Sequence, residues 1–275
     1  MRSFFLLPGM LLILMGLSLR KPDRNSSDRN DIVDKRKSTI KVMTYNVRHC
    51  NPPSKKGVIE VASIAKVIND AKPDLVALQE LDRFTKRSGV ELDQAKELGR
   101  LTGMYSYFVK AIDWDGGEYG VAILSRFKIL DSMHLSLPMA DGIAGEARAV
   151  AIVKVKIKTK ELLFASTHLD IVKEHRELQA SKIVDYFSKS KIPVILAGDL
   201  NDMPESTTLK LFGNHFQLTC ALPSCGKTFP QVNPTRTIDY IMYKPERFFK
   251  TVNHQVIPDE YASDHRPVMA TLEFE

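Results

Sequence analysis

Short, apolar, strand-like segments alternate with helix-like segments from residue 40 to the C-terminus. Apolar spacing and end signals such as Gly103 predict helices over 58–71, 92–102 and 174–188, the last amphipathic. Strands are predicted over 40–47, 75–81, 119–124, 149–157, 162–167, 193–197, 238–243, 252–257 and 268–274. Because β-α-β units are mixed with strands that follow one another directly, the order predicts an α/β fold with mixed sheets inside and helices outside.

The first 37 residues differ in composition from the rest of the chain. The segment Phe4–Leu19 is almost wholly apolar but shorter than the roughly 20 residues that span a bilayer. It therefore fits the core of a signal peptide better than a membrane anchor, which remains the alternative. Residues 20–37 are polar and charged, which predicts a flexible linker before a functional domain over 38–275. We expect an exported monomer, periplasmic, secreted or membrane-anchored, whose membrane contact would run through residues 1–19.

Charge and cysteine content give weaker indications. The net charge of +6 favours anionic partners such as phosphate esters or acidic lipid surfaces. Of the three cysteines, Cys220 and Cys225 are close enough in sequence to bridge in an oxidising compartment, which would leave Cys50 free. Three reduced cysteines fit the sequence equally well. The sequence contains no CxxC motif or Cys/His cluster that would indicate zinc.

Polar residues recur where apolar strand-like segments end. All of them carry a carboxylate, an amide or an imidazole: Asn46, Gln79, Glu80, His168, Asp170, Asp199, Asn201, Asp239, Asp264 and His265. In α/β sheets, ligands collect at strand ends, where loops bring distant residues together. Their repetition along the chain therefore predicts one shared site.

The segments that hold these residues also carry a resemblance. They read TYNVR (44–48), LQE (78–80), STHLD (166–170), GDLND (198–202), TIDY (237–240) and SDHRP (263–267). In this order they resemble the motif set of the endonuclease/exonuclease/phosphatase superfamily, the pancreatic-deoxyribonuclease-like proteins, over about residues 40–275. The resemblance implies a four-layer α/β sandwich, with two mixed sheets packed face to face and helices outside. LQELDRFTKRSG, EYGVAILSR and GEARAV further resemble a secreted bacterial branch.

Phosphoester hydrolysis needs a cation on the phosphate, an activated water in line with the scissile bond, and a proton for the leaving oxygen. Glu80 and Asp264 offer hard carboxylate ligands and Asn46 a neutral oxygen, a donor set that suits Mg²⁺ or Mn²⁺. By resemblance, Asp239 orients His265, which handles the leaving-group proton.

The remaining roles also follow from the resemblance. Asp199 would orient or deprotonate the attacking water, and Asn201 would hold the phosphate. These two side chains would project to the same side if the backbone between them stays extended. The alternative is a structural Asx turn that caps a helix beginning near Pro204. His168 is expected to be a second imidazole on the phosphate side. The looser matches are expected substrate contacts, with purely structural roles as their alternative: Glu118, which would orient His168, Tyr119 and Arg148.

The sequence therefore predicts a divalent-metal-dependent hydrolase that cleaves a phosphodiester or phosphomonoester by in-line attack of an activated water. Lipid, sugar or inositol phosphoesters are favoured as substrates, because no long basic insertion that would grip a nucleic-acid duplex is evident. A nuclease acting on DNA or RNA is the first alternative. The second is a catalytically silent binding module with the same fold.

Overall fold

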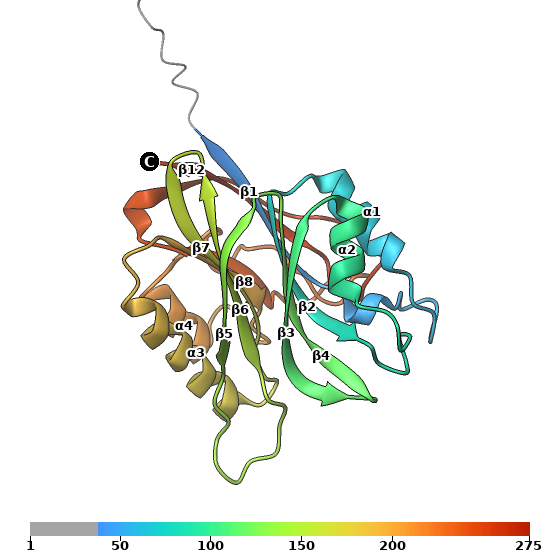
Figure 1. The fold of residues 1–275 in the computed structure, drawn as a ribbon. Coiled ribbons are helices and arrows are strands. Elements are labelled where there is room, and N and C mark those ends of the chain that lie inside the picture. The colour runs from blue at the N-terminus through green and yellow to red at the C-terminus, as the bar shows by residue number, and fades with distance from the viewer. Residues whose placement is uncertain (1–37) are drawn as a thin grey trace, which may run out of the picture. The chain divides into compact units, whose positions relative to one another are not determined.

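The computed structural model describes residues 38–275, which form two six-stranded sheets with helices on their outer faces (Figure 1). The first sheet has the strand order β11-β12-β1-β2-β4-β3, comprising β1 (Thr39–Asn46), β2 (Leu75–Arg83), β3 (Tyr105–Trp114), β4 (Gly117–Ser125), β11 (Phe249–Val256) and β12 (Val268–Phe274). The second has the order β5-β6-β7-β8-β10-β9, comprising β5 (Ile129–Ser136), β6 (Ala149–Ile157), β7 (Lys160–His168), β8 (Val194–Asp199), β9 (Gln217–Leu218) and β10 (Asp239–Lys244).

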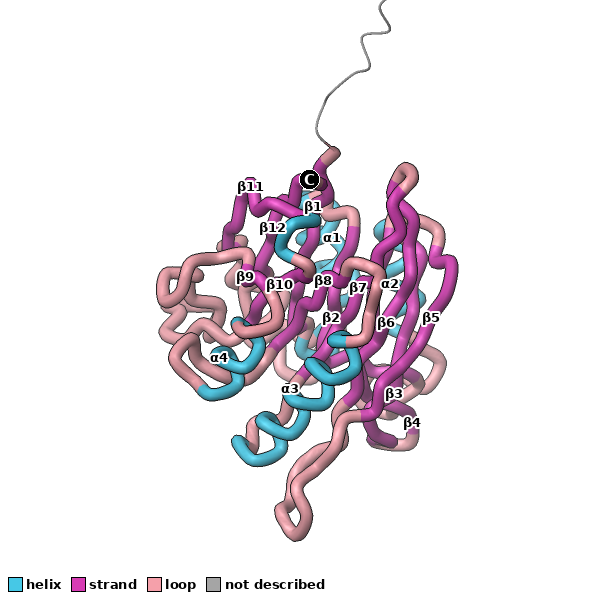
Figure 2. The backbone as a smooth tube through the Cα atoms, turned by 90° about the vertical axis from the view of Figure 1, so that its left-hand side faces the viewer, coloured by secondary structure: helices cyan, strands magenta, loops and turns pink. Residues whose placement is uncertain are grey.

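Four α-helices complete the described part of the chain: α1 (Val61–Ala71), α2 (Gln94–Thr102), α3 (Lys173–Ser188) and α4 (Thr207–Gly213). One apolar cluster joins the two sheets and includes Val42 of β1 and Phe164 of β7. A second packs α1 and α2 on the first sheet, and a third packs α3 and α4 on the second. Figure 2 shows α3 and α4 lying across the second sheet. The predicted four-layer α/β sandwich is therefore confirmed.

Strand register brings the polar strand ends together. The parallel pair β1–β2, connected through α1, sets Asn46 beside Gln79. The parallel pair β7–β8, connected through α3, sets His168 beside Asp199. β10 runs antiparallel to β8 and sets Asp239 opposite Asp199. In each parallel pair, the crossover connection makes the second strand run in the same direction as the first. The carboxyl ends of the two paired strands therefore lie at the same edge of their sheet.

Three strands are not predicted by the sequence: β3, β5 and the two-residue β9. β3 and β5 are edge strands, and every residue of β5 is exposed or partly exposed. An edge strand need not carry the continuous apolar run that marks a central strand. The helix expected to begin near Pro204 is present as α4, which begins at Thr207.

The amphipathic helix predicted over 174–188 is present as α3, but its buried face is not purely apolar. His175, Arg176 and Gln179 are among its buried residues. Gln179 Oε1 accepts from the backbone N–H of Asp170, and Arg176 Nη1 donates to the carbonyl oxygen of Asp170. This face of the helix therefore holds the loop that follows β7, a role that apolar periodicity cannot reveal.

The structure decides between the alternatives for the cysteines. Cys220 and Cys225 form a disulfide, and Cys50 is free and buried. Within residues 38–275, no helix is long and apolar enough to cross a membrane. The expected signal peptide or anchor and the expected linker lie outside the described residues.

Candidate active site

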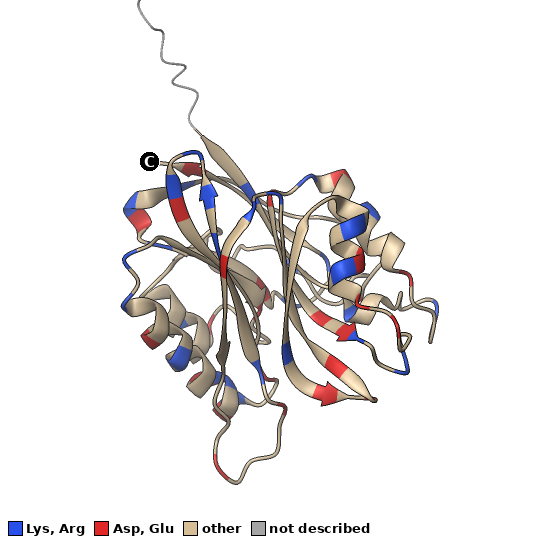
Figure 3. Cartoon of the chain, viewed as in Figure 1, with Lys and Arg blue, Asp and Glu red and all other residues tan. Residues whose placement is uncertain are grey.

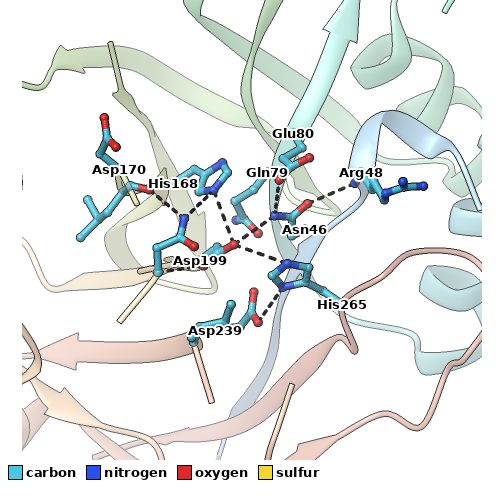
Figure 4. Close-up of polar contacts among 12 residues, drawn as sticks. Asn46, Arg48, Gln79, Glu80, His168, Asp170, Asp199, Asp239 and His265 are labelled. Atoms are coloured by element: carbon cyan, nitrogen blue, oxygen red, sulfur yellow. Dashed lines mark hydrogen bonds and ion pairs between the residues drawn. The ribbon is translucent and has the colours of Figure 1, made fainter. Parts of the chain in front are cut away.

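The predicted acid–base pair is formed by the start of β10 and the loop before β12. His265 Nδ1 lies 3.0 Å from Asp239 Oδ2, and both side chains are buried (Figure 4). Burial alone would lower the pKa of His265, but the carboxylates of Asp239 and Asp199 outweigh it and raise that pKa to about 10. The ring is therefore protonated near neutral pH, with its Nε2 side facing Asp199 Oδ2 at 3.7 Å.

Asp199, at the end of β8, lies at the centre of the site. Its Oδ2 accepts from Asn46 Nδ2 at 3.0 Å and lies 3.5 Å from His168 Nε2. Burial, with the charge of Asp239 adding to it, raises the pKa of Asp199 to about 7. A carboxyl whose pKa lies near neutrality is suited to accept a proton from water.

Glu80 reaches the site because β2 is irregular at this point. The pairing of β2 with β4 shifts register between Leu78 and Leu81, and Glu80 has the left-handed backbone angle φ of 62°. A bulge of this kind redirects a side chain, and left-handed non-glycine residues cluster at functional sites. Burial raises the pKa of Glu80, opposed by the hydrogen bond from Asn46 and reinforced by the charge of Asp264.

Asn46, at the end of β1, links the two sheets. Its Nδ2 donates to Glu80 Oε1 at 2.9 Å and to Asp199 Oδ2 at 3.0 Å (Figure 4). Its Oδ1 accepts from the backbone N–H of Arg48 at 3.1 Å. In this rotamer the amide nitrogen faces the two carboxylates, so an oxygen ligand from Asn46 stays a prediction.

His168, at the end of β7, is buried beside Arg148. Arg148 Nη1 lies 3.1 Å from His168 Nδ1, and Arg148 Nη2 lies 2.8 Å from Glu146 Oε2. A guanidinium only donates, so the Arg148 contact favours an accepting Nδ1 with the ring proton on Nε2, whereas the Asn201 amide nitrogen 3.0 Å from Nε2 favours the other tautomer. Burial and then the charge of Arg148 lower the pKa of His168. The two imidazoles therefore differ, since His168 is neutral and His265 is charged.

Asn201 reaches the site by a different backbone path from the one expected. Its φ is 50°, so the backbone after Asp199 is not extended, and the condition for the two side chains to project to the same side is not met. The Asn201 N–H donates to Asp199 Oδ1 at 2.9 Å, which closes a tight turn. Asn201 Nδ2 donates to the Leu169 carbonyl oxygen at 2.9 Å and lies 3.0 Å from His168 Nε2.

Two predicted residues lie elsewhere. Glu118 accepts a hydrogen bond from Arg83 Nε, so its expected role in orienting His168 is replaced by Arg148 and Asn201. Asp170 accepts from the backbone N–H groups of Glu146 and Val172, and therefore holds a loop.

Tyr119 is half-buried and lines a cavity together with Glu80 and Asp264. The cavity also reveals residues that sequence reasoning did not assign to the site: Arg48, His49, Arg87, Trp114 and Glu146. Arg48 directly follows Asn46 and Val47 in TYNVR, and Arg87 lies in LQELDRFTKRSG. Those two matched segments were the available signal for them.

Two groups of residues could hold a divalent cation. Glu80 and Asp264 line the same cavity, and the ligand atoms of Asp199, Asp239 and His265 all lie within 4.8 Å of one another. Among the described residues, Asp239 Oδ1 is buried without a hydrogen-bond partner. A buried carboxylate oxygen without a partner, near other carboxylates, fits the oxygen donor set of a hard cation.

The fold is shared with solved structures of low sequence identity. An endonuclease/exonuclease/phosphatase from Bacteroides vulgatus superposes with a TM-score of 0.71 at 21% identity, over 87% of this chain and 100% of that one. A mannosyl-6-phosphatase from Bacteroides thetaiotaomicron VPI-5482 gives 0.68 at 23%, over 86% and 100%. The catalytic domain of human Nocturnin gives 0.64 at 20%, over 86% and 95%.

None of the curated proteins compared with this chain matches it. A family model does match, over residues 43–265, and this span runs from β1 to the histidine that pairs with Asp239. The chain therefore belongs to the endonuclease/exonuclease/phosphatase family.

Proposed function

We propose that this protein is a divalent-metal-dependent hydrolase that cleaves phosphoesters by attack of a water activated at Asp199. The observation that carries the proposal is the buried arrangement of Asp199, Asp239 and His265, in which one imidazole is charged and one carboxyl has a pKa near neutrality. An acid and a base of this kind, side by side, provide both proton transfers that hydrolysis needs.

The residues divide the chemistry between them. Asp199 accepts the proton of the attacking water, and His265, held by Asp239, donates a proton from Nε2 to the leaving oxygen. His168 lies on the phosphate side of the site, and Arg148 behind it adds positive charge there. A bound cation would neutralise phosphoryl charge, with Glu80 and Asp264 as its carboxylate ligands.

Metal removal tests the proposal directly. All the carboxylate and amide ligands expected here are oxygen donors, so Mg²⁺ or Mn²⁺ should support turnover and EDTA should abolish it. The measurement is hydrolysis of bis-p-nitrophenyl phosphate and p-nitrophenyl phosphate by purified protein, before chelation, after it, and after the metal is restored. Full activity in metal-free buffer would contradict this mechanism.

For the substrate, we favour a sugar, inositol or lipid phosphoester over nucleic acid. One similar structure is described as a mannosyl-6-phosphatase, which supports a small phosphomonoester. In the view of Figure 3, basic and acidic residues are interspersed, whereas duplex binding relies on clustered basic side chains. A panel of sugar phosphates, inositol phosphates, sphingomyelin, plasmid DNA and RNA ranks these classes, and preferred cleavage of DNA or RNA would favour the nuclease instead.

A further inference from the structure

Most of the residues that line one cavity have no role in the chemistry above. This cavity measures about 180 Å³, with Glu80 and Asp264 on its wall toward the catalytic residues. Its other walls include Arg48, Arg87, Trp114 and Glu146. A phosphoryl group bound through a cation at Glu80 and Asp264 would therefore place the rest of its substrate in this cavity.

Trp114 and Tyr119 both line the cavity, and Trp114 is the more exposed of these two aromatic residues. Trp114 is the last residue of β3, its side chain is 43% exposed, and it is the single tryptophan of the chain. The Arg87 guanidinium carbon lies 5.4 Å from the centre of its ring. One part of the indole therefore packs on Arg87, while another part stays accessible to a ligand.

Arg87 is held in place by a fully buried carboxylate. Asp82 accepts from Arg87 Nε at 2.7 Å and Nη2 at 2.8 Å, and also from the hydroxyl groups of Thr85 and Ser88. The backbone N–H of Arg87 donates to Asp115 Oδ2 at 2.7 Å, which ties this loop to the tip of the β3–β4 hairpin. The aromatic wall is thus fixed before any ligand arrives, which lowers the entropic cost of binding.

We propose that this cavity binds the ring of a phosphorylated monosaccharide or cyclitol, with a C–H face of the ring against Trp114 and hydroxyl groups toward Glu146 and Arg48. The inference rests on the proposed phosphoesterase function and names its substrate class. It commits to a ring polyol rather than to a lipid or a nucleic acid.

The chemistry of the lining favours a polyol. Glu146 is half exposed and anchored by Arg148, and Arg48 is oriented by its Nη1 hydrogen bond to the Asn51 carbonyl oxygen at 3.0 Å. A hydroxyl group both donates and accepts, so a ring that carries several can satisfy carboxylate and guanidinium walls together. An acyl chain would instead cover these charged groups without pairing them, which is unfavourable.

The size of the cavity also limits its occupant. About 180 Å³ is below the roughly 300–1,000 Å³ of pockets for drug-sized ligands, so a single ring fits it better than an extended chain. A nucleobase would also stack on an indole, so the tests must separate a base from a polyol.

Selectivity kinetics provide the first test, with the full chain and Mg²⁺. Trp114→Ala should lower kcat/KM for hexose 6-phosphates about tenfold more than for glycerol 3-phosphate, and the loss should come chiefly from a higher KM. Glycerol 3-phosphate is the comparison because it has the same type of ester but no ring. Trp114→Phe should restore most of the lost selectivity. Tyr105→Ala, which removes another exposed aromatic side chain of β3, should leave the ratio unchanged. Equal losses on both substrates in Trp114→Ala would overturn the inference.

Fluorescence provides a second test that needs no change at Trp114. Because this is the single tryptophan, its emission reports on the cavity directly. In a His265→Ala variant, which binds without rapid turnover, hexose 6-phosphate should give a saturable change that orthophosphate and glycerol 3-phosphate do not. An equal response to orthophosphate, or a stronger one to deoxynucleoside monophosphates, would overturn the polyol assignment. If wild type hydrolyses no phosphoester at all, the proposed function itself fails.

Discussion

At the scale of single residues, the site depends on buried charges that are balanced against one another. His265 would be neutral if burial alone decided, yet the carboxylates of Asp239 and Asp199 keep it protonated. The pKa of Asp199 is also raised, but for a carboxyl this disfavours the charged form, and burial and the charge of Asp239 are the causes. His168 is kept neutral by burial and Arg148. Near neutral pH, His265 is therefore charged, His168 is neutral, and Asp199 lies close to its pKa.

These shifts predict the pH dependence of turnover. Asp199 acts only when deprotonated, so kcat/KM should rise as pH passes about 7. His265 acts only when protonated, so kcat/KM should fall as pH passes about 10. A pH–rate profile at saturating Mg²⁺ measures both limits. His265→Gln should lose the alkaline limit, and a variant that retains it would assign that limit to another group.

A double-mutant cycle tests whether Asp239 acts through His265. Loss of a general acid typically lowers the rate by roughly 10²–10⁴, so His265→Ala should be almost inactive. Adding Asp239→Asn should cost little more, because the two residues act as a unit. Additive losses would show that Asp239 has another role, such as the cation contact that its unpartnered Oδ1 permits.

Metal titration of the same variants separates proton chemistry from cation binding. His265→Ala should bind Mg²⁺ nearly as wild type does, whereas Glu80→Ala should bind it more weakly. Near-normal turnover in His265→Ala would make His168 the first candidate for the proton donor.

At the scale of elements, loops reach the site through contacts with residues that take no part in the chemistry. The segment between β5 and β6 carries Glu146 and Arg148, and it is held where the N–H of Glu146 donates to Asp170 Oδ2 at 3.0 Å. A Cβ added at Gly145 would lie 2.8 Å from that same oxygen and 2.8 Å from His175 Cε1. Both side chains are buried, so neither has room to yield.

Gly145→Ala should therefore destabilise the protein by about 1–3 kcal/mol, as overpacking of a buried contact usually does, and should also lower kcat because Arg148 loses its position. Urea unfolding and steady-state kinetics measure the two effects. The matched control is Gly213→Ala, where a Cβ would meet nothing within 4 Å and the backbone is not left-handed. This change should be neutral or slightly stabilising. Equal behaviour of the two variants would contradict the tight packing at Gly145.

At the scale of the whole molecule, we propose that the protein is exported. The apolar segment Phe4–Leu19 motivates the proposal, and the disulfide between Cys220 and Cys225 is consistent with an oxidising compartment. The mature chain should then begin near residue 19 and be found outside the cytoplasm. Mass spectrometry of native protein in cell fractions checks this. An intact Met1 in the membrane fraction would favour an anchor, and an intact Met1 in a soluble cytoplasmic pool would argue against export.

The sequence by itself determined the fold class and most of the residues that meet at the site. Central strands such as β2 and β8 are buried on both faces, so their apolar runs are visible without a structure, and the polar residues that end them stand out. The ordered motifs also predict that Asp199, Asp239 and His265 belong to one site.

Only the tertiary structure decided how those residues work. The pairing of His168 with Arg148 instead of Glu118 and the cavity at Trp114 join segments that are apart in the chain. The left-handed backbone at Glu80 and Asn201 redirects side chains within a segment. Local periodicity reports whether a residue faces the core, but not which buried partner it meets there. Protonation states depend on that partner, because the pKa of a buried group is set by the charges within a few ångströms of it.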